Sequence, residues 1–307
     1  MTITVSVIIP ALNEEALIIQ TLESVLAALD FLPATVASEV IVVDNGSTDN
    51  TRIAVESVSE QIRILDCPAK GAARARNLGA KVSMGTILFF LDADTTIPAS
   101  SITEIVKQCS QNGVSAGITK LGPRSGGFRA CWWWVFWNSV RSLPLPRAKA
   151  MPAFMFCTRN TFNEFGPFDE QVAIGEEWPI LAGLYRSRRR EFLYLRSVTA
   201  WTSSRRMEDI PFGYTHLFLK YVWAILDHRG RIYYPDTIRN GAATFPERAP
   251  SQIRKRELGG RGWTSVAKEA PGFRQSPPTP ATPSCCHDNA QASTREPLDL
   301  PARDFPQ

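Results

Sequence analysis

The chain has 307 residues, 44% of them apolar, and a formal net charge of +4. This length allows one large domain or two small ones with a packed core, and the charge is too small to indicate nucleic-acid binding. The six cysteines and three histidines are scattered without metal-binding spacing, which argues against a disulfide framework and favours reduced thiols in the cytoplasm.

In the first third of the chain, short apolar runs alternate with helical patterns. Each run is too short for a helix, so we expect four buried strands, at residues 5–10, 40–43, 62–65 and 87–91. A helix should follow each strand, and the side chains placed to cap three of these helices are Asn13, Ser47 or Thr48, and Ser101 with Glu104. Such alternation produces right-handed βαβ units, so the sequence predicts an α/β fold with a mostly parallel sheet and helices on both faces.

Acidic residues close two of these strands. Asp44 follows the second strand, and Asp92 and Asp94 follow the fourth. The carboxyl ends of parallel strands share one edge of the sheet, where open α/β sheets bind ligands, so these side chains should line one crevice. Two carboxylates one residue apart suit Mg²⁺ or Mn²⁺, while an Asp-rich turn without a metal is the alternative. No glycine-rich dinucleotide motif or P-loop follows a strand, which argues against those nucleotide sites.

The second half is less regular and rich in aromatic residues. Residues 130–137 include four tryptophans beside Arg129, which favours either a helix packed into the core or a membrane interface. We expect a strand at 153–159, and at 211–227 an amphipathic helix that packs on the domain or lies on a membrane. Arginines cluster at 186–190 and 205–206, where they suit phosphates, an anionic membrane or a solvated surface.

The two ends of the chain give further expectations. The N-terminus lacks a basic region and no apolar stretch could span a bilayer, so neither a signal peptide nor a spanning helix is expected. From residue 246 proline recurs among Ser, Thr and Gln, which predicts a disordered tail at 246–307. The run Cys285-Cys286-His287 in that tail has no matching ligands nearby, so we assign it no metal.

Four segments resemble the successive signature blocks of the family 2 glycosyltransferases, in the family's order and approximate spacing. They are Ser6-Val-Ile-Ile-Pro-Ala-Leu-Asn-Glu-Glu15, Val42-Val-Asp-Asn-Gly-Ser-Thr-Asp-Asn-Thr51, Gly71-Ala-Ala-Arg-Ala-Arg-Asn-Leu-Gly79 and Leu91-Asp-Ala-Asp94. The resemblance covers residues 4–210 and implies a Rossmann-like GT-A fold that binds a UDP- or GDP-sugar. It divides a domain at 1–245 into a nucleotide-sugar-binding half, 1–118, and a smaller acceptor-side half, 119–245.

The resemblance also implies roles for individual residues. It places the following near the donor: Pro10, Ala11, Glu14, Asp44, Lys70, Arg74, Asn77, Asp92, Ala93 and Arg206. Asp44 would hold the base or ribose, Asn77 would brace the site, and Asp92 with Asp94 would bind Mg²⁺ or Mn²⁺. Arg76 competes with Arg74 for the donor, because two residues so spaced on a helix cannot both face the cleft.

The acceptor side carries a further block. Gly166-Pro167-Phe168-Asp169-Glu170 is similar to the family's Gly-Gly-Phe-Asp-Glu block, and Glu176-Glu177 then stands where the family has Glu-Asp, the site of its catalytic base. Glu177 replaces the aspartate and is the expected base. Glu176 is the alternative base, or it only places charge at a helix N-terminus.

The sequence therefore predicts an inverting glycosyltransferase that uses a UDP- or GDP-sugar and acts on an acceptor hydroxyl or phosphate. The expected acceptor is a membrane lipid or a glycan, not a nucleic acid, and the expected location is the cytoplasm, including the inner face of the plasma membrane. One alternative is a sugar-phosphate nucleotidyltransferase, against which the glycine-free loop at 11–15 argues. The other is a non-catalytic nucleotide-sugar-binding protein.

Overall fold

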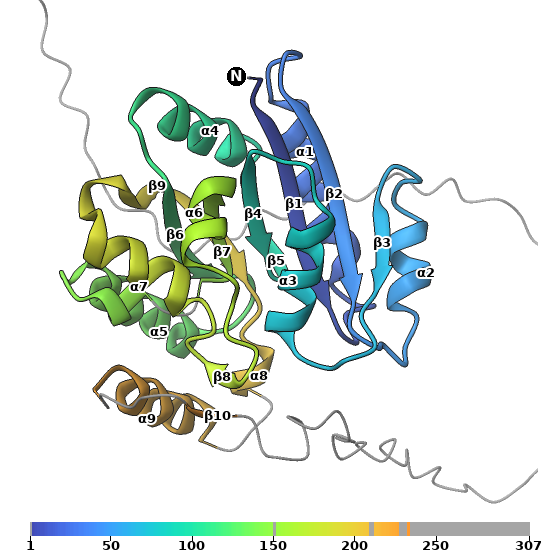
Figure 1. Cartoon of the computed structure of the whole chain (residues 1–307). Coiled ribbons are helices and arrows are strands. Elements are labelled where there is room, and N and C mark those ends of the chain that lie inside the picture. The colour runs from blue at the N-terminus through green and yellow to red at the C-terminus, as the bar shows by residue number, and fades with distance from the viewer. Residues whose placement is uncertain (1, 150–151, 209–211, 227–231, 234–307) are drawn as a thin grey trace, which may run out of the picture. The chain divides into compact units, whose positions relative to one another are not determined.

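The computed structural model describes residues 2–149, 152–208, 212–226 and 232–233, and the predicted tail at 246–307 lies outside them. In this part of the chain a central sheet of eight strands is flanked by helices (Figure 1). In spatial order the strands are β3 (Arg63–Asp66), β2 (Ala37–Asp44), β1 (Thr4–Ala11), β4 (Ile87–Leu91), β7 (Phe154–Thr158), β6 (Ala116–Pro123), β9 (Phe192–Thr202) and β5 (Thr95–Thr96). A separate antiparallel pair consists of β8 (Val172–Ile174) and β10 (Ile232–Tyr233).

The helices alternate with the strands along the chain. The longer ones are α1 (Ile18–Asp30), α3 (Ala72–Val82), α4 (Ser101–Gln111), α5 (Phe128–Ser142), α7 (Trp178–Ser187) and α9 (Gly213–Leu226). Shorter segments are α2 (Thr51–Glu56), α6 (Arg159–Phe165), α8 (Arg205–Glu208) and the 3-10 turns η1 (Pro146–Lys149) and η2 (Arg189–Glu191).

The first half of the sheet has the predicted parallel arrangement. β1 pairs in parallel with both β2 and β4, and β2 pairs in parallel with β3. The second half is mixed, since β7 runs antiparallel to β4 and to β6, while β9 runs parallel to β6. The two-residue strand β5, which the sequence did not predict, follows Asp94 directly and pairs with β9. It ties the chain after β4 to the far side of the sheet.

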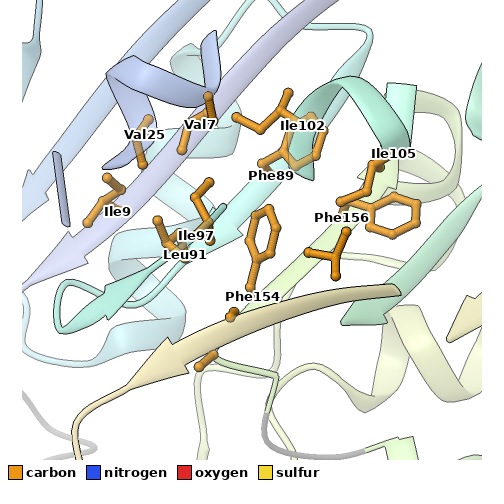
Figure 2. Packing of buried hydrophobic residues seen from close by; sticks show 14 of the residues in the cluster. Val7, Ile9, Val25, Phe89, Leu91, Ile97, Ile102, Ile105, Phe154 and Phe156 are labelled. Carbon is orange, nitrogen blue, oxygen red and sulfur yellow. The ribbon is translucent and has the colours of Figure 1, made fainter. Parts of the chain in front are cut away.

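Alternate side chains of the sheet enter two cores. On β1, Val7 and Ile9 belong to the core with α1 and α4, whereas Ile8 belongs to the core with α3. Figure 2 shows how the first core continues to β7, where the rings of Phe89 and Phe154 stack 5.9 Å apart. Burying one such side chain stabilises the fold by roughly 1.5–3 kcal/mol. Helices therefore pack on both faces of the sheet, as predicted.

The predicted helix cap at Asn13 is wrong. Helix α1 begins only at Ile18, so neither Asn13 nor the two glutamates after it lie in the first turn of α1. Asn13 instead has a left-handed backbone, with φ 55°, and its Oδ1 accepts a hydrogen bond from the Thr48 N–H over 2.8 Å. The side chain joins two loops at the edge of the sheet, a tertiary role that local sequence did not reveal.

The other predicted caps are wrong as well. Helix α2 begins at Thr51, beyond Ser47 and Thr48, and the Thr51 N–H donates to Asp49 Oδ1 over 3.0 Å. Ser101 is already helical, so it does not form a capping box with the glutamate three residues later. The end predicted for α4 is confirmed, because that helix stops at residue 111 before a glycine with φ 66°.

The aromatic run at 130–137 lies in α5 and faces both inward and outward. Trp132 and Phe136 are exposed, while the inward face of the helix buries Trp133, Trp134 and Trp137. Helix α9, predicted at 211–227, packs against α5, and one ring pair, Trp133 with Tyr214, has centroids 5.6 Å apart. Among the described helices, none combines the length and apolar character needed to cross a membrane.

Candidate active site

A cleft of about 520 Å³ opens at the carboxyl ends of β1 and β4. Its floor includes residues from three predicted blocks: Pro10, Ala11, Glu14, Asp92, Ala93, Asp94, Glu176 and Glu177. Its walls include Lys70 before α3, Thr202 and Ser203 at the end of β9, and side chains from two aromatic helices: Trp133, Trp134, Leu217 and Tyr221. The cleft therefore lies at the sheet edge where ligand binding was predicted.

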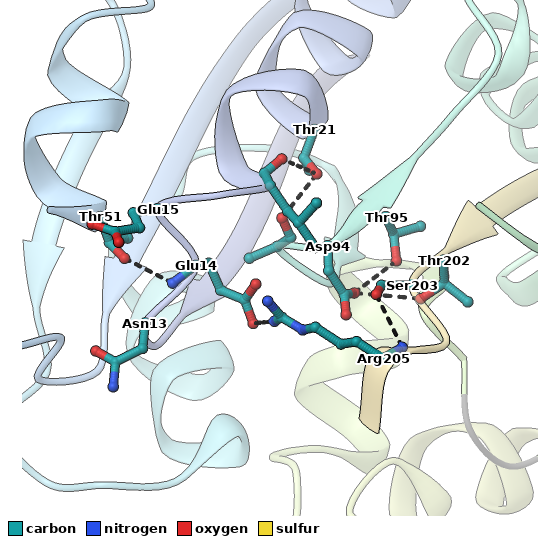
Figure 3. A network of polar contacts seen from close by, with 12 residues as sticks. Asn13, Glu14, Glu15, Thr21, Thr51, Asp94, Thr95, Thr202, Ser203 and Arg205 are labelled. Carbon is teal, nitrogen blue, oxygen red and sulfur yellow. Dashed lines mark hydrogen bonds and ion pairs between the residues drawn. The ribbon is translucent and has the colours of Figure 1, made fainter. Parts of the chain in front are cut away.

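Asp94 lies where β4, β5 and β9 meet. Its side chain is buried, and its Oδ1 accepts hydrogen bonds from the hydroxyls of Thr95 and Thr202, each 3.3 Å away (Figure 3). Asp92 is anchored through its backbone N–H, which donates to the Ala153 carbonyl over 2.9 Å. Threonines of β5 and β9 thus fix the direction of Asp94, and the residue before β7 holds the backbone of Asp92.

Arg76 links the two acidic groups of the cleft. Its Nη2 donates to Asp92 Oδ1 over 2.6 Å, and its Nη1 pairs with Glu176. The guanidinium also lies over the Phe168 ring, 5.6 Å from the centroid. The side chains of Arg76 and Glu176 are only 11% and 13% exposed, so water screens that ion pair weakly, whereas Asp92 is 37% exposed and its pair is screened more.

The two arginines of α3 point in different directions. Arg74 directs its Nε toward Glu170, 3.4 Å from Oε2, while Arg76 and Lys70 line the cleft. Two residues apart on a helix correspond to a rotation of about 200°, so this divergence follows from helix geometry. The structure therefore places Arg76 at the cleft, so the expectation that Arg74 contacts the donor is wrong.

Asp44 and Asn77 are not among the residues that line the cleft, so of the three aspartates expected in one crevice Asp92 and Asp94 line it and Asp44 does not. Both residues instead support the loops around the cleft. Asp44 Oδ1 accepts a hydrogen bond from the Ser47 N–H over 2.9 Å, which closes the turn after β2. Asn77 bonds twice to the backbone of Phe168, donating to its carbonyl over 3.0 Å and accepting from its N–H over 2.9 Å. Asn77 thereby braces the segment that leads to the two cleft glutamates.

Asn45 lines the cleft and was not identified from the sequence. Its Nδ2 donates to the Ala69 carbonyl over 2.8 Å, and its Oδ1 accepts from the Gly71 N–H over 2.6 Å. These bonds hold the loop that carries Lys70 against the end of β2. The feature of the sequence that could have indicated Asn45 is its position directly after Asp44, at the same strand end.

Glu14 pairs with an arginine from the far end of the sheet. It is 4% exposed, its Oε1 contacts Arg205 Nη2, and its backbone N–H donates to Thr51 Oγ1 over 2.8 Å (Figure 3). Arg205 is the first of the two arginines after β9, and the side chain of Arg206 lies outside the described structure. Arg205 is therefore the arginine of this pair that the structure places against a cleft residue.

The adjacent glutamates Glu176 and Glu177 have different surroundings. Glu177 is 5% exposed and precedes α7, where its carbonyl accepts from the Leu181 N–H over 3.0 Å. Glu176 pairs with Arg76, so the interpretation that it only places charge at the helix N-terminus is wrong. Gly175 before them has φ 84°, a conformation that glycine adopts without steric cost, and this turn lets both glutamates line the cleft.

A buried cation lies behind the aromatic wall of the cleft. Arg141 is 1% exposed, and its guanidinium lies 5.8 Å from the ring centroid of Trp134. Burial lowers the pKa of Arg141 to about 10, an effect that Tyr194, Tyr221 and Glu177 partly oppose. Arg141 therefore remains charged at neutral pH and contributes positive potential on the side of Glu177.

Asp92 and Asp94 are the carboxylates of the cleft that could bind a metal ion. In the part of the chain that the structure describes, no three His, Cys, Asp or Glu side chains form a metal-binding group. Two carboxylates are too few to enclose an ion, but Mg²⁺ commonly binds through one or two carboxylates and completes its shell with phosphate oxygens and water. These residues therefore fit a divalent ion that is shared with a diphosphate.

Comparison with known proteins assigns the fold and the family. The α/β fold is of the GT-A type, since the mannosyltransferase PcManGT from Pyrobaculum calidifontis, solved with GDP-Man and Mn²⁺, superposes with a TM-score of 0.52 at 22% identity. That match covers 72% of this chain and 61% of the mannosyltransferase. The model described as Glycosyl transferase family 2 matches residues 6–193, more than half of the chain. The chain belongs to this family.

Two curated relatives match shorter segments. The chain is 41% identical over 103 residues to glucosyl-3-phosphoglycerate synthase of Mycobacterium tuberculosis, covering 31% of this chain and 30% of the relative. It is 36% identical over 114 residues to the Escherichia coli UDP-Glc:alpha-D-GlcNAc-diphosphoundecaprenol beta-1,3-glucosyltransferase WfgD, covering 36% of this chain and 43% of the relative. The chain thus matches less than half the length of either relative.

Proposed function

We propose that this protein is an inverting glycosyltransferase that moves a sugar from a UDP- or GDP-sugar to an acceptor hydroxyl or phosphate. The observation that carries the proposal is the arrangement of two acidic pairs in one cleft: Asp92 with Asp94, and Glu176 with Glu177, joined by Arg76. Family membership supports sugar transfer. The named donors of two similar proteins, UDP-glucose and GDP-mannose, support the donor class.

The donor side of the cleft would bind the nucleoside diphosphate. Asp92 and Asp94 would hold Mg²⁺ or Mn²⁺, and such an ion neutralises charge on the leaving diphosphate. Lys70 lies on the loop that Asn45 holds in place, so its ammonium is positioned for a phosphate or base. Asp44 lies at the adjacent strand end, where it would meet the ribose or base.

The acceptor side would supply the base. Glu177 would take the proton of the acceptor hydroxyl while the acceptor oxygen attacks the anomeric carbon from the face opposite the leaving group. The new carbon–oxygen bond forms as the bond to the diphosphate breaks, so one displacement inverts the anomeric centre. Arg76 holds Glu176 beside this position, and Phe168 packs under Arg76. Glu176 would thereby orient the site rather than accept the proton.

The acceptor and the extent of the domain are also part of the proposal. The name of WfgD includes a diphosphoundecaprenol acceptor, and an aromatic wall borders this cleft, which together support a membrane lipid or lipid-linked glycan. We place the protein in the cytoplasm, at the inner face of the membrane. Residues 1–118 would form the donor half and 119–245 the acceptor half.

The test is a panel of UDP- and GDP-sugars, measured by thermal stabilisation with Mn²⁺ and with EDTA, followed by product analysis. The proposal expects one sugar to stabilise the fold with Mn²⁺ and to release UDP or GDP only when an acceptor is added. Exchange between a nucleoside triphosphate and a sugar phosphate would indicate the nucleotidyltransferase instead. Stabilisation without turnover on any lipid or glycan acceptor would favour a binding protein.

A further inference from the structure

The outward sides of α5 and α9 carry a large apolar surface that neither core uses. Trp132 is 58% exposed and Trp223 is 66% exposed, values far from those of core tryptophans. We call this surface the aromatic face, and its members are Phe128, Trp132, Phe136, Phe212, Leu219 and Trp223. Exposed apolar patches of this kind mark binding sites for proteins or membranes.

Helical spacing gathers these side chains into rows. On α5, Phe128, Trp132 and Phe136 recur every four residues and so lie along one side of the helix. On α9, Leu219 and Trp223 have the same spacing. The opposite sides of both helices are fixed by packing, because Trp133 and Trp137 of α5 contact rings of α9 and belong to the first core. Phe136, at the edge of the outward row, also contacts Phe218 of α9. The outward rows are therefore held in place and do not collapse inward.

The charged side chains on the two helices of the aromatic face are all basic, and the carboxylate beside them, Glu208 of α8, accepts a hydrogen bond from the Tyr214 hydroxyl over 3.3 Å. Neither α5 nor α9 contains an aspartate or glutamate, while Arg129 and Lys220 are both exposed on them. Arg129 lies over the Tyr214 ring, 5.1 Å from its centroid, which sets the cation beside the aromatic rows. Aromatic side chains flanked by Lys and Arg are typical of helices that lie in the headgroup region of an anionic bilayer.

The dimensions of the helices agree with a surface position. They contain 15 and 14 residues, so they extend about 21–23 Å and cannot cross the roughly 30 Å hydrocarbon core. Their inner sides supply Trp133, Trp134, Leu217 and Tyr221 to the wall of the cleft. The same two helices thus connect the aromatic face with the cleft.

We propose that the aromatic face docks on an anionic lipid membrane and brings the cleft to the level of the headgroups. A membrane-borne acceptor would then reach the cleft along the wall formed by α5 and α9. The inference rests on the proposed function only for the identity of the acceptor. Docking itself requires no catalysis and is tested separately.

The first experiment measures co-sedimentation of the full chain with vesicles of phosphatidylcholine alone or mixed with phosphatidylglycerol. We expect binding to the mixed vesicles that weakens as salt is added, because salt screens the basic residues. Replacing Trp132→Ser together with Trp223→Ser should reduce vesicle affinity about tenfold or more. The matched control replaces two exposed apolar residues elsewhere, Ile53→Ser with Met84→Ser, which are 64% and 84% exposed, and should bind as the unchanged chain does.

A charge variant tests the electrostatic part. Lys220→Gln should weaken binding to anionic vesicles about fivefold, since one basic residue near such a surface contributes that much. Lys107→Gln, at an exposed position on α4, should leave vesicle binding unchanged. Equal losses in both lysine variants would show a non-specific charge effect and would overturn the assigned face.

A second pair of substitutions distinguishes a loss of membrane binding from a loss of folding. Trp132→Phe with Trp223→Phe keeps the face apolar, so binding should persist while quenching of tryptophan fluorescence by brominated lipid falls. Absence of binding to anionic vesicles at low salt overturns the proposal. A monomer–dimer equilibrium that Trp132→Ser with Trp223→Ser abolishes would also overturn the proposal, because the aromatic face would then join two copies of the chain. A chain that docks but transfers no sugar would overturn the proposed function alone.

Discussion

Arg76 donates a hydrogen bond to Asp92 over 2.6 Å while its second Nη pairs with Glu176. The three residues come from α3, from the end of β4 and from the segment before α7, so one guanidinium connects the donor and acceptor halves of the proposed site. A divalent ion at Asp92 would share that carboxylate with Arg76. Arg76 is therefore central to both the stability and the chemistry of the cleft.

The first prediction concerns this link. Arg76→Met should lower the free energy of unfolding by about 1–3 kcal/mol, because it leaves two partly buried carboxylates without their cation. The Asp92 side chain is 37% exposed, and water screening there keeps the cost at the lower end. Urea unfolding measures the change. Arg74→Met, which removes the more exposed pair with Glu170, should cost less than about 1 kcal/mol, and equal costs would contradict this assignment.

The second prediction concerns the metal. Asp94→Asn should weaken Mn²⁺-dependent binding of the nucleotide-sugar at least about tenfold, because it removes a carboxylate ligand of the proposed ion. Calorimetric titration of the sugar with Mn²⁺ and with EDTA measures this. Asp66→Asn is a suitable control, since Asp66 ends β3 at the edge of the sheet, is exposed and pairs with Arg52. Equal affinity of the unchanged chain in Mn²⁺ and in EDTA would disprove the metal site.

The third prediction concerns Gly79, the last residue of the third signature block. A Cβ at this position would lie 2.5 Å from Ile8 Cγ2 and 3.2 Å from Val43 Cγ2, so the glycine lets α3 pack closely on the sheet. Alanine normally favours a helix by about 1 kcal/mol over glycine, yet here overpacking should make Gly79→Ala destabilising by about 1–3 kcal/mol. Thermal unfolding measures the sign. At Gly127 a Cβ would have no neighbour within 4 Å, so Gly127→Ala should change stability little, and a stabilising Gly79→Ala would show that the packing can relax.

The strands of the first half could be predicted because each is a short, buried apolar run. The run at 87–91 matches β4 residue for residue, and acidic residues at the strand ends indicated the correct edge of the sheet. The mixed second half depends on pairing between distant segments. The strand β5 has only two residues and no pattern of its own, although it fixes Asp94.

The orientation of polar side chains was harder to predict than the positions of the strands. Helix α3 is rich in alanine and arginine, so its apolar pattern does not reveal which arginine faces the sheet edge, and Arg76 rather than Arg74 lines the cleft. Asn13 and Ser101 were assigned as caps from local sequence. In the fold, Asn13 bonds to a distant loop and Ser101 lies within its helix. Tertiary contacts decide such cases, and a single sequence does not show them.

The fourth prediction concerns a buried lysine of η1 whose ammonium group binds the end of α5. Lys149 is 3% exposed, and its Nζ donates to the carbonyls of Arg141 and Leu143 at the end of that helix. Burial lowers the pKa of Lys149 to about 8, with a further contribution from Arg189 and Arg196. Between this value and the ordinary lysine pKa of 10.5, the unfolded chain holds a proton that the folded chain has released. Stability conferred by Lys149 should therefore rise with pH across this window.

Lys149→Met isolates this contribution. The free energy of unfolding of the unchanged chain, minus that of the variant, should increase by about 1–3 kcal/mol as pH rises through the window. Below about pH 8 the lysine is protonated in both the folded and the unfolded chain, and above pH 10.5 it is neutral in both. The difference in free energy of unfolding between the two proteins should therefore be constant at either end of the window. Urea unfolding at several pH values gives both curves, and curves that stay parallel throughout would contradict the lowered pKa.

The last prediction concerns the general base. Glu177→Gln should lower kcat by about 10²- to 10⁴-fold, the usual contribution of a positioned base, while donor affinity should change little because the proposed donor contacts are made by other residues. Glu176→Gln should have a smaller effect on kcat but should weaken the link to Arg76 and lower stability. Glu164→Gln controls for loss of a surface carboxylate, since Glu164 is 53% exposed and pairs with Arg188. Steady-state kinetics with a saturating donor distinguishes the cases. A larger kcat loss in the Glu176 variant would move the role of base to that residue, and unchanged rates in both would remove the glutamates from the mechanism.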